Sequence, residues 1–177
     1  MKFETRQRID GSPDEVEKAM LDERYLDFLL KHHGVLLELA LLERRDDGQK
    51  VHRKVRYRPR PVIKTVGTKE VPEEWFAFIE TSTYDRSRRE MTFTNTPTTP
   101  KIANLLQNQG TLRIVPKNGA TERVIEGDIG LKLPFLLKPL ALLGEKMIQS
   151  EGLKILDADV PILNRFISEV VRPRKAE

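Results

Sequence analysis

The chain has 177 residues, enough for one domain with a sizeable core, and its 38% hydrophobic and 33% charged residues are typical of a globular protein with a charged surface. Cysteine is absent, which excludes disulfides and thiolate chemistry, and the net charge is only +4. The polar N-terminus lacks the pattern of a signal peptide, and no apolar run reaches the roughly 20 residues of a membrane-spanning helix, so we expect a cytoplasmic protein.

An N-terminal strand and two helices are predicted first. Polar and apolar residues alternate over Lys2–Ile9, which predicts the strand. Residues 12–15, Ser-Pro-Asp-Glu, have the pattern of a capping box with proline at the first helical position, which predicts a helix start. A second helix is predicted over residues 23–32, and Gly34 ends it.

Six further strands and a long helix follow. The first begins at Val35, where alternation predicts that Leu37 and Leu39 share one face. The others are predicted at residues 50–58, 75–84, 88–95, 111–115 and 122–133. Because their connections are too short for crossover helices, these strands should form an antiparallel meander. A helical segment is predicted over residues 134–171, with a break at Pro139 and a kink or restart at Pro161.

Two stretches resemble the START-like (SRPBCC) superfamily, which includes birch-pollen allergens, polyketide cyclases and uncharacterised bacterial families, one of which this chain is most similar to. Residues 9–19, Ile-Asp-Gly-Ser-Pro-Asp-Glu-Val-Glu-Lys-Ala, are similar to its strand-to-helix entry. Residues 127–134, Gly-Asp-Ile-Gly-Leu-Lys-Leu-Pro, are similar to its last strand leading into a long helix. The order of elements matches over nearly the whole chain.

The resemblance implies an α+β helix-grip fold. In this fold a seven-stranded curved antiparallel sheet wraps around a long C-terminal helix, in the order β-α-α-β6-α, with a cavity between them and the last strand beside the first. We expect a single domain over residues 1–177, of which residues 172–177 form a disordered tail.

Long connections are predicted to converge on one end of the sheet. Tight turns at residues 46–49, 85–87 and 116–119 lie at the opposite end, because successive connections of a meander alternate between ends. Long segments are often functional. The apolar residues predicted to form an entrance there are Val62, Ile63, Ile102, Leu105, Phe135 and Leu136, with lysines and arginines around them. Such loops suit docking on an anionic membrane, or they fold back and plug the core.

Alternation places a charged residue among apolar ones on the predicted inner face. If Val55 and Tyr57 face inward, Arg53 shares their face, and Glu80 of the next strand lies within its reach. Arg53 then anchors a ligand headgroup, with Tyr57 and Asn95 as further polar contacts, or it forms a structural pair with Glu80. A slip of one residue would invert these faces. The residues predicted to line the cavity are Leu37, Leu39, Arg53, Val55, Tyr57, Phe78, Glu80, Phe93, Asn95, Ile114, Leu140, Leu143 and Met147.

Other groups that could carry chemistry give no recognised site. Glu126 and Asp128 alternate away from the apolar positions, so they should face solvent, where Arg6 and Arg8 are natural partners if the last strand lies beside the first. The three histidines have no metal-binding spacing, so we expect no metal and no cofactor. No phosphate-binding glycine motif and no nucleophile motif is present.

The sequence favours non-catalytic binding or transport of a hydrophobic, lipid-like ligand in an internal cavity. A cyclase or hydrolase that uses the same cavity is the first alternative, with Glu80 and either Tyr57 or Arg53 as its acid–base pair. An interaction module is the second, with the basic positions His52, Lys54, Arg56 and Arg58 on one strand. That strand has few aromatic residues for base stacking, so nucleic acid is not an expected partner. The oligomeric state is not defined by the sequence.

Overall fold

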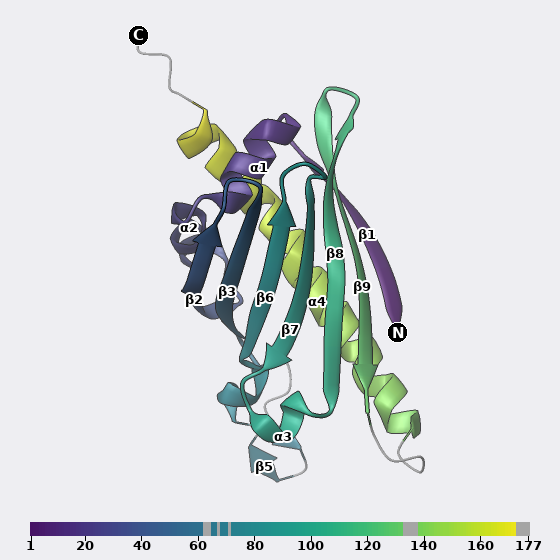
Figure 1. Ribbon diagram of the computed structural model, residues 1–177. Helices are drawn as coiled ribbons and strands as arrows, with labels where there is room; N and C mark the ends of the chain where they lie inside the picture. The colour runs from purple at the N-terminus through teal and green to yellow at the C-terminus, as the bar shows by residue number, and fades with distance from the viewer. Residues whose placement is uncertain (62–64, 67, 71, 133–137, 173–177) are drawn as a thin grey trace.

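Seven antiparallel strands form one curved sheet, and helices lie against one of its faces (Figure 1). The computed structural model describes residues 1–61, 65–66, 68–70, 72–132 and 138–172. The strands of the sheet are β1 (Lys2–Ile9), β2 (Leu36–Asp46), β3 (Lys50–Pro59), β6 (Phe78–Asp85), β7 (Glu90–Pro97), β8 (Leu106–Lys117) and β9 (Ala120–Leu131). The helices are α1 (Pro13–Leu21), α2 (Arg24–His32), η1 (Glu73–Phe76), α3 (Pro100–Ala103), α4 (Lys138–Phe166) and η3 (Ile167–Val171). A second small sheet pairs β4 (Thr65–Val66) with β5 (Lys69–Glu70).

The strand order of the sheet is β1-β9-β8-β7-β6-β3-β2, so the first strand lies beside the last. All six strand pairs are antiparallel. The long helix α4 crosses the face that α1 and α2 also cover (Figure 1). These features confirm the predicted helix-grip fold.

The two ends of the sheet differ in their connections. At the hairpin end, tight turns join β2 to β3, β6 to β7 and β8 to β9. Gly48 and Gly119 take positive φ values of 89° and 79° there, a conformation that glycine adopts without strain. At the loop end, longer segments join β3 to β6, β7 to β8 and β9 to α4. The predicted separation of tight and long connections is therefore confirmed.

The capping box predicted at the start of α1 is present. The Ser12 hydroxyl accepts a hydrogen bond from the Glu15 N–H at 3.3 Å, and the Glu15 carboxylate accepts one from the Ser12 N–H at 2.8 Å. Arg172 also donates to Glu15, at 2.9 Å. Arg172 was predicted to begin the disordered tail, but this contact gives it a defined position, whereas residues 173–177 lie outside the described residues.

Some predicted boundaries were wrong, and each has a physical reason. Trp75 lies in the 3₁₀ turn η1 rather than in a strand, because Pro72 directs the chain into that turn. β8 begins at Leu106, five residues before its predicted start. Asn108 and Gly110 stand at its inward positions, so the expected apolar alternation is missing there.

The structure describes the C-terminal helix from Lys138 onward, so the short helix predicted before Pro139 lies outside the described residues. Pro139 is the second residue of α4, a position where its missing N–H costs no hydrogen bond. Pro161 lies inside α4 without ending it. Leu163 and Phe166, which follow it, are almost fully buried, and their packing holds the helix through the proline.

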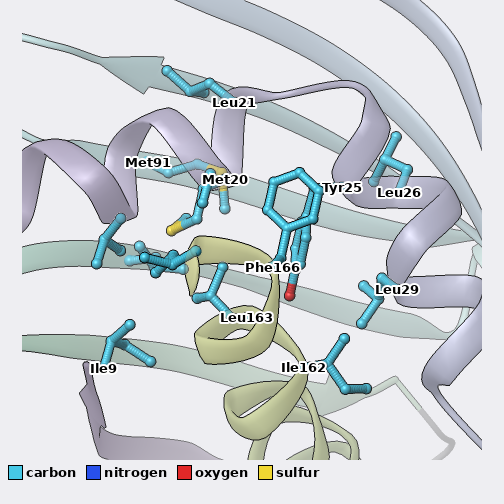
Figure 2. Close-up of a cluster of buried hydrophobic side chains, with 14 of the residues drawn as sticks. Ile9, Met20, Leu21, Tyr25, Leu26, Leu29, Met91, Ile162, Leu163 and Phe166 are labelled. Atoms are coloured by element: carbon cyan, nitrogen blue, oxygen red, sulfur yellow. The ribbon is translucent and has the colours of Figure 1, made fainter. Parts of the chain in front are cut away.

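The hydrophobic core lies at the hairpin end. Figure 2 shows Leu163 and Phe166 of α4 among Met20 of α1 and Tyr25 of α2. The rings of Tyr25 and Phe166 pack edge to face, with centroids 5.2 Å apart. The C-terminal half of α4 is therefore held by packing against both short helices and the sheet.

Four buried polar side chains from four elements form one network, which we call the buried polar network: Gln7 of β1, Tyr25 of α2, Arg123 of β9 and Asp159 of α4. Arg123 is 3% exposed and donates to the Asp159 carboxylate at 2.6 Å and to the Gln7 side-chain oxygen at 2.9 Å. The Tyr25 hydroxyl donates to the same carboxylate. The network joins α2 and α4 to the sheet, with its charges paired and hydrogen-bonded.

We expect Arg123→Met to lower the free energy of unfolding by about 3–5 kcal/mol, because Asp159 would stay buried without its cation. Urea unfolding followed by circular dichroism measures this change. The matched control is Arg113→Met, which removes an exposed ion pair with Glu126 on the outer face and should cost less than about 1 kcal/mol. Equal losses for the two variants would contradict a stabilising role for the network.

Candidate functional site

Three adjacent strands bring polar side chains together on the inner face of the sheet. β3 supplies Arg53 and Tyr57, β6 supplies Glu80 and Ser82, and β7 supplies Asn95. The register places Glu80 directly opposite Asn95, and Ser82 directly opposite Arg53. Opposite residues have β-carbons about 5 Å apart and diagonal ones about 7–8 Å, so all five side chains are neighbours. We call these five residues the inner polar cluster.

The inward direction of these residues follows from their strand neighbours. Val51 and Val55 of β3 are 1% exposed and belong to the core, and Arg53 and Tyr57 share their phase. The opposite phase of the strand faces the outside, as His52 does. The predicted inward phase of this strand is therefore confirmed.

Apolar and aromatic side chains surround the cluster. The rings of Tyr57 and Phe78 are stacked, with centroids 5.1 Å apart and planes within 6° of parallel. Leu39 lies opposite Tyr57 on β2, and Phe93 lies opposite Ser82 on β7. The polar groups thus stand within an apolar wall that contains a flat aromatic surface.

The inner face is closed at the hairpin end and incompletely covered by the described residues toward the loop end. Val51, Tyr84 and Met91, which face inward at the hairpin end, are buried. Nearer the loop end, Val55 and Ser82 are also buried. The inward-facing residues of the same three strands that are only half-buried there are Arg53, Tyr57, Phe78, Glu80, Phe93 and Asn95. The inner face is therefore less completely packed toward the loop end than at the hairpin end.

Arg53 does not form the structural pair with Glu80 that was one of the two predicted alternatives. Its guanidinium donates to the Met20 carbonyl at 2.8 Å and lies 3.8 Å from the sulfur of Met91. No carboxylate lies within 4.0 Å of it among the residues that the structure describes. Within the described part of the chain, the inner face therefore holds a cation that forms no ion pair.

Two groups of the cluster have raised pKa values. Burial raises the pKa of the Glu80 carboxyl, and the Arg53 guanidinium only partly opposes this shift. Burial also raises the pKa of the Tyr57 phenol, and the nearby Glu80 carboxylate adds to the shift. Both side chains thus favour their neutral forms, in which each can donate a hydrogen bond.

Two further polar atoms of the cluster are buried without a hydrogen-bond partner in the described part of the chain. They are the Ser82 hydroxyl oxygen, which faces Glu80 without reaching hydrogen-bond geometry, and the Asn95 side-chain oxygen. A buried polar group without a partner costs about 1–3 kcal/mol. The cluster can therefore bond a polar group brought by a ligand.

The structure places several predicted cavity residues elsewhere. Leu37 falls in a β-bulge between Leu36 and Glu38, so Leu36 takes the buried position that alternation assigned to Leu37. Ile114 faces inward at the hairpin end and belongs to the packed core. Met147 lies on α4 and is exposed rather than part of a cavity wall.

The predicted entrance is only partly described. Val62, Ile63, Phe135 and Leu136 lie outside the described residues. Ile102 is half-buried in α3, and Leu105, which follows it, is exposed. Leu140 and Leu143, predicted to line the cavity, lie in the first two turns of α4.

The basic positions on the outer side of β3 are neutralised by neighbouring acids. Lys54 pairs with Glu43 at 2.9 Å, and Arg56 pairs with Glu38 at 3.2 Å. Arg58 also contacts Glu38, at 3.3 Å. This pairing removes most of the charge that an interaction module would offer to an anionic partner.

The outer carboxylates face solvent as predicted, but their predicted partners were wrong. Glu126 pairs with Arg113, and Arg6 contacts Glu122 at 3.1 Å. The antiparallel register is the reason, because it places Arg6 opposite Val124 and Arg8 opposite Glu122. These residues form a surface ladder.

Two other kinds of site are not formed by the residues that the structure describes. Among the described residues, no group of three or more histidine, aspartate or glutamate side chains is arranged to hold a metal ion. A surface hollow of about 490 Å³ lies beside α1, and its two arginines, Arg86 and Arg89, are paired with Asp46 and Asp14. Its charges satisfy one another, unlike those of the inner polar cluster.

No helix in the described part of the chain is long and apolar enough to cross a membrane.

Sequence reasoning missed two features of the interior. Ser82 has the same phase as Glu80, so alternation could have placed it beside Arg53. Gln7 and Arg123 stand at apolar positions of their strands, which is the signal for a buried polar pair. Their partner, Asp159, is 36 residues beyond Arg123, and no local pattern connects the two.

Comparisons with known proteins establish the class of this fold. No family model and no curated protein sequence matches the chain. The Zhui aromatase/cyclase from Streptomyces sp. R1128 is 14% identical, with a TM-score of 0.67 over 100% of this chain and 99% of that chain. A point mutant of norcoclaurine synthase from Thalictrum flavum is 15% identical, with a TM-score of 0.62 over 97% of this chain and 96% of that chain. A START superfamily protein from Mycobacterium smegmatis is 13% identical, with a TM-score of 0.51 over 92% and 98% of the two chains.

At these identities the likeness shows the fold alone, and the shared fold is the helix-grip fold that the sequence predicted.

We expect Glu80→Gln to stabilise the protein increasingly as the pH rises from about 4 to about 8. The folded chain raises the pKa of Glu80 above its unfolded value, so wild-type stability falls as the pH rises through the folded pKa. Glutamine removes that loss. Thermal unfolding of both proteins across this pH range measures the difference.

Glu15→Gln provides a control, because its effect on stability should have the opposite sign to that of Glu80→Gln. Arg172 and the Ser12 N–H lower the pKa of Glu15 to about 2, so this carboxylate stabilises the fold above its unfolded pKa. The variant should be less stable than wild type near neutral pH, and the difference should shrink as the pH falls toward 2. A pH-independent difference for Glu80→Gln would contradict the burial of its carboxyl.

Proposed function

We propose that this chain binds and carries a hydrophobic, lipid-like ligand inside the fold without converting it, and exchanges the ligand at a membrane surface. The apolar body would lie against the inner wall, and the polar end would meet the inner polar cluster. One observation carries the proposal: Arg53 and Glu80 face inward from neighbouring strands, among apolar side chains, without pairing with each other. The proposed ligand contacts are Leu39, Arg53, Val55, Tyr57, Phe78, Glu80, Phe93 and Asn95.

The free-energy cost of leaving Arg53 without a carboxylate partner supports the binding of a ligand. An unpaired charge inside a protein is destabilising, and a purely structural arginine would be expected to bond a carboxylate. Arg53 instead bonds one backbone carbonyl and approaches one sulfur. An anionic headgroup would supply the missing partner and would accept a hydrogen bond from the Ser82 hydroxyl, whereas the Asn95 side-chain oxygen would accept one from a ligand hydroxyl.

The stacked rings of Tyr57 and Phe78 support an apolar or aromatic ligand body. Their exposed inner surface is flat and lies beside Glu80 in the ladder of β3 and β6. Among the matched structures, the norcoclaurine synthase is in complex with a transition state analogue, so this fold can hold a small molecule.

Acid–base catalysis at the same site is a second candidate function, favoured by one observation. The Glu80 carboxyl, whose pKa is raised, faces inward near the Tyr57 phenol. A carboxyl whose pKa is raised holds its proton more tightly than an exposed one and can donate it and take it back. The two functions differ in their product: a carrier releases the ligand unchanged, and an enzyme releases a different compound.

We expect Arg53→Met to weaken the binding of a fluorescent fatty acid by about ten-fold or more, because a charge-assisted hydrogen bond contributes about 1.5–3 kcal/mol. Fluorescence titration measures the affinity. Methionine keeps most of the side-chain volume, so the apolar wall is retained.

Lys54→Met is the matched control, since Lys54 is the next residue of β3 and faces outward to Glu43. It should change the affinity by less than about two-fold. Equal weakening in both variants would show that net charge, and not the inner polar cluster, governs binding. No binding by the folded wild-type protein would contradict the proposed function.

A further inference from the structure

Exposed apolar side chains gather at the loop end of the molecule. Among the described residues, the large apolar side chains that are exposed are Val35, Leu42, Trp75, Leu105, Val115, Leu142 and Met147. Leu42 lies within β2 and Val115 near the hairpin end, whereas the other five lie at the loop end or in the N-terminal half of α4. A gathering of this kind marks an interaction surface.

Two of these residues, Leu105 and Leu142, each lie beside an exposed lysine. The Lys132 N–H donates to the Leu105 carbonyl at 2.7 Å, so the end of β9 and the start of β8 present both residues together. Lys146 lies one helical turn after Leu142 in α4. Neither lysine has an ion pair within the part of the chain that the structure describes. Each apolar side chain therefore has an unpaired cation next to it.

A third pair and an aromatic residue extend this surface. The Arg60 N–H donates to the Val35 carbonyl at 2.7 Å, and the Arg60 guanidinium bonds only a backbone carbonyl among the described residues. Trp75, in η1, is 49% exposed. The Thr99 hydroxyl donates to the Glu74 carbonyl at 3.4 Å, which holds η1 beside the start of α3. Tryptophan is enriched where a protein meets the boundary between lipid and water.

Three acidic residues at the loop end are bonded within the protein. Glu73 and Glu74 pair with Arg58 at 3.4 and 3.5 Å. Glu145 accepts a hydrogen bond from the Leu131 N–H at 2.8 Å, which also fixes this part of α4 against the end of β9. None of these three acids forms an ion pair with Arg60, Lys132 or Lys146, so these cations keep their charge for a partner.

We propose that the loop end docks on a lipid surface that carries anionic headgroups. Leu105, Leu142 and Trp75 enter the boundary between headgroups and acyl chains, while Lys132 and Lys146 contact the headgroups. This inference rests on the proposed function, because docking there turns the incompletely covered half of the inner face toward the bilayer that supplies the ligand.

Trp75 reports docking directly, because it is the only tryptophan of the chain. Its emission is recorded as the full-length protein is titrated with vesicles of phosphatidylglycerol and phosphatidylcholine in equal parts, and with vesicles of phosphatidylcholine alone. Docking predicts a blue shift with the anionic vesicles that weakens as the salt concentration rises. Co-sedimentation with the same vesicles gives an independent measure of binding.

Matched variants locate the surface. Leu105→Ser and Leu142→Ser should each weaken vesicle binding by about ten-fold. Lys132→Gln and Lys146→Gln should each weaken it by about five-fold. Val115→Ser is the control at the hairpin end, since Val115 is 39% exposed and Leu105 is 38% exposed, and it should change binding by less than about two-fold. All five changes are at the surface, and thermal unfolding confirms that each variant is folded.

The outcomes separate docking from ligand binding. Vesicle binding that falls in the loop-end variants and not in Val115→Ser supports the proposal. No blue shift and no co-sedimentation would overturn it, while fatty-acid titration would still show whether the ligand site exists. Equal binding by all variants would also overturn it, as would a dimer in solution that Leu105→Ser converts to a monomer.

Discussion

The ion pair between Arg123 and Asp159 is the contact on which the rest of the structure depends. Its partners, Gln7 and Tyr25, come from the first strand and the second helix, so one network joins elements from both ends of the sequence. The same arginine also reaches the Leu156 carbonyl at 3.4 Å. Because α4 is held at this point of the sheet, its C-terminal half completes the core and its N-terminal half extends toward the loop end.

The inner face of the sheet therefore carries two groups of polar residues that differ in their hydrogen bonds and ion pairs. Arg123 is buried and bonds a carboxylate and an amide, as a structural arginine should. Arg53 lies on the same face, and no carboxylate of the described residues bonds it. Ser82 and Asn95 beside it each hold a buried side-chain oxygen that no hydrogen bond of the described residues reaches. This contrast within one sheet is the physical reason for the proposal that the inner polar cluster serves a ligand rather than the fold.

Alternation predicted the sheet and the direction of β3 because charged residues mark every outward position of that strand, from His52 to Arg58. It failed at Leu37, since a bulge is not visible in a pattern of period two. The alternative pair between Arg53 and Glu80 was wrong for a different reason: a carbonyl of α1, which sequence cannot place, takes the guanidinium. The buried polar network was missed because Asp159 is distant from Arg123 in the sequence. Sequence patterns thus predicted which face of the sheet each strand residue occupies and at which end of the sheet each connection lies. The contacts between the helices and the sheet could be seen only in the structure.

Native mass spectrometry of the protein purified from its own host, followed by extraction and identification of any released compound, shows whether the chain carries a ligand. A carrier would be found as a one-to-one complex with a compound that has an apolar body and one polar end, and this compound would be recovered unchanged after incubation with fresh protein. A ligand-free mass, from a folded protein that also takes up no fatty acid, would contradict the proposed function.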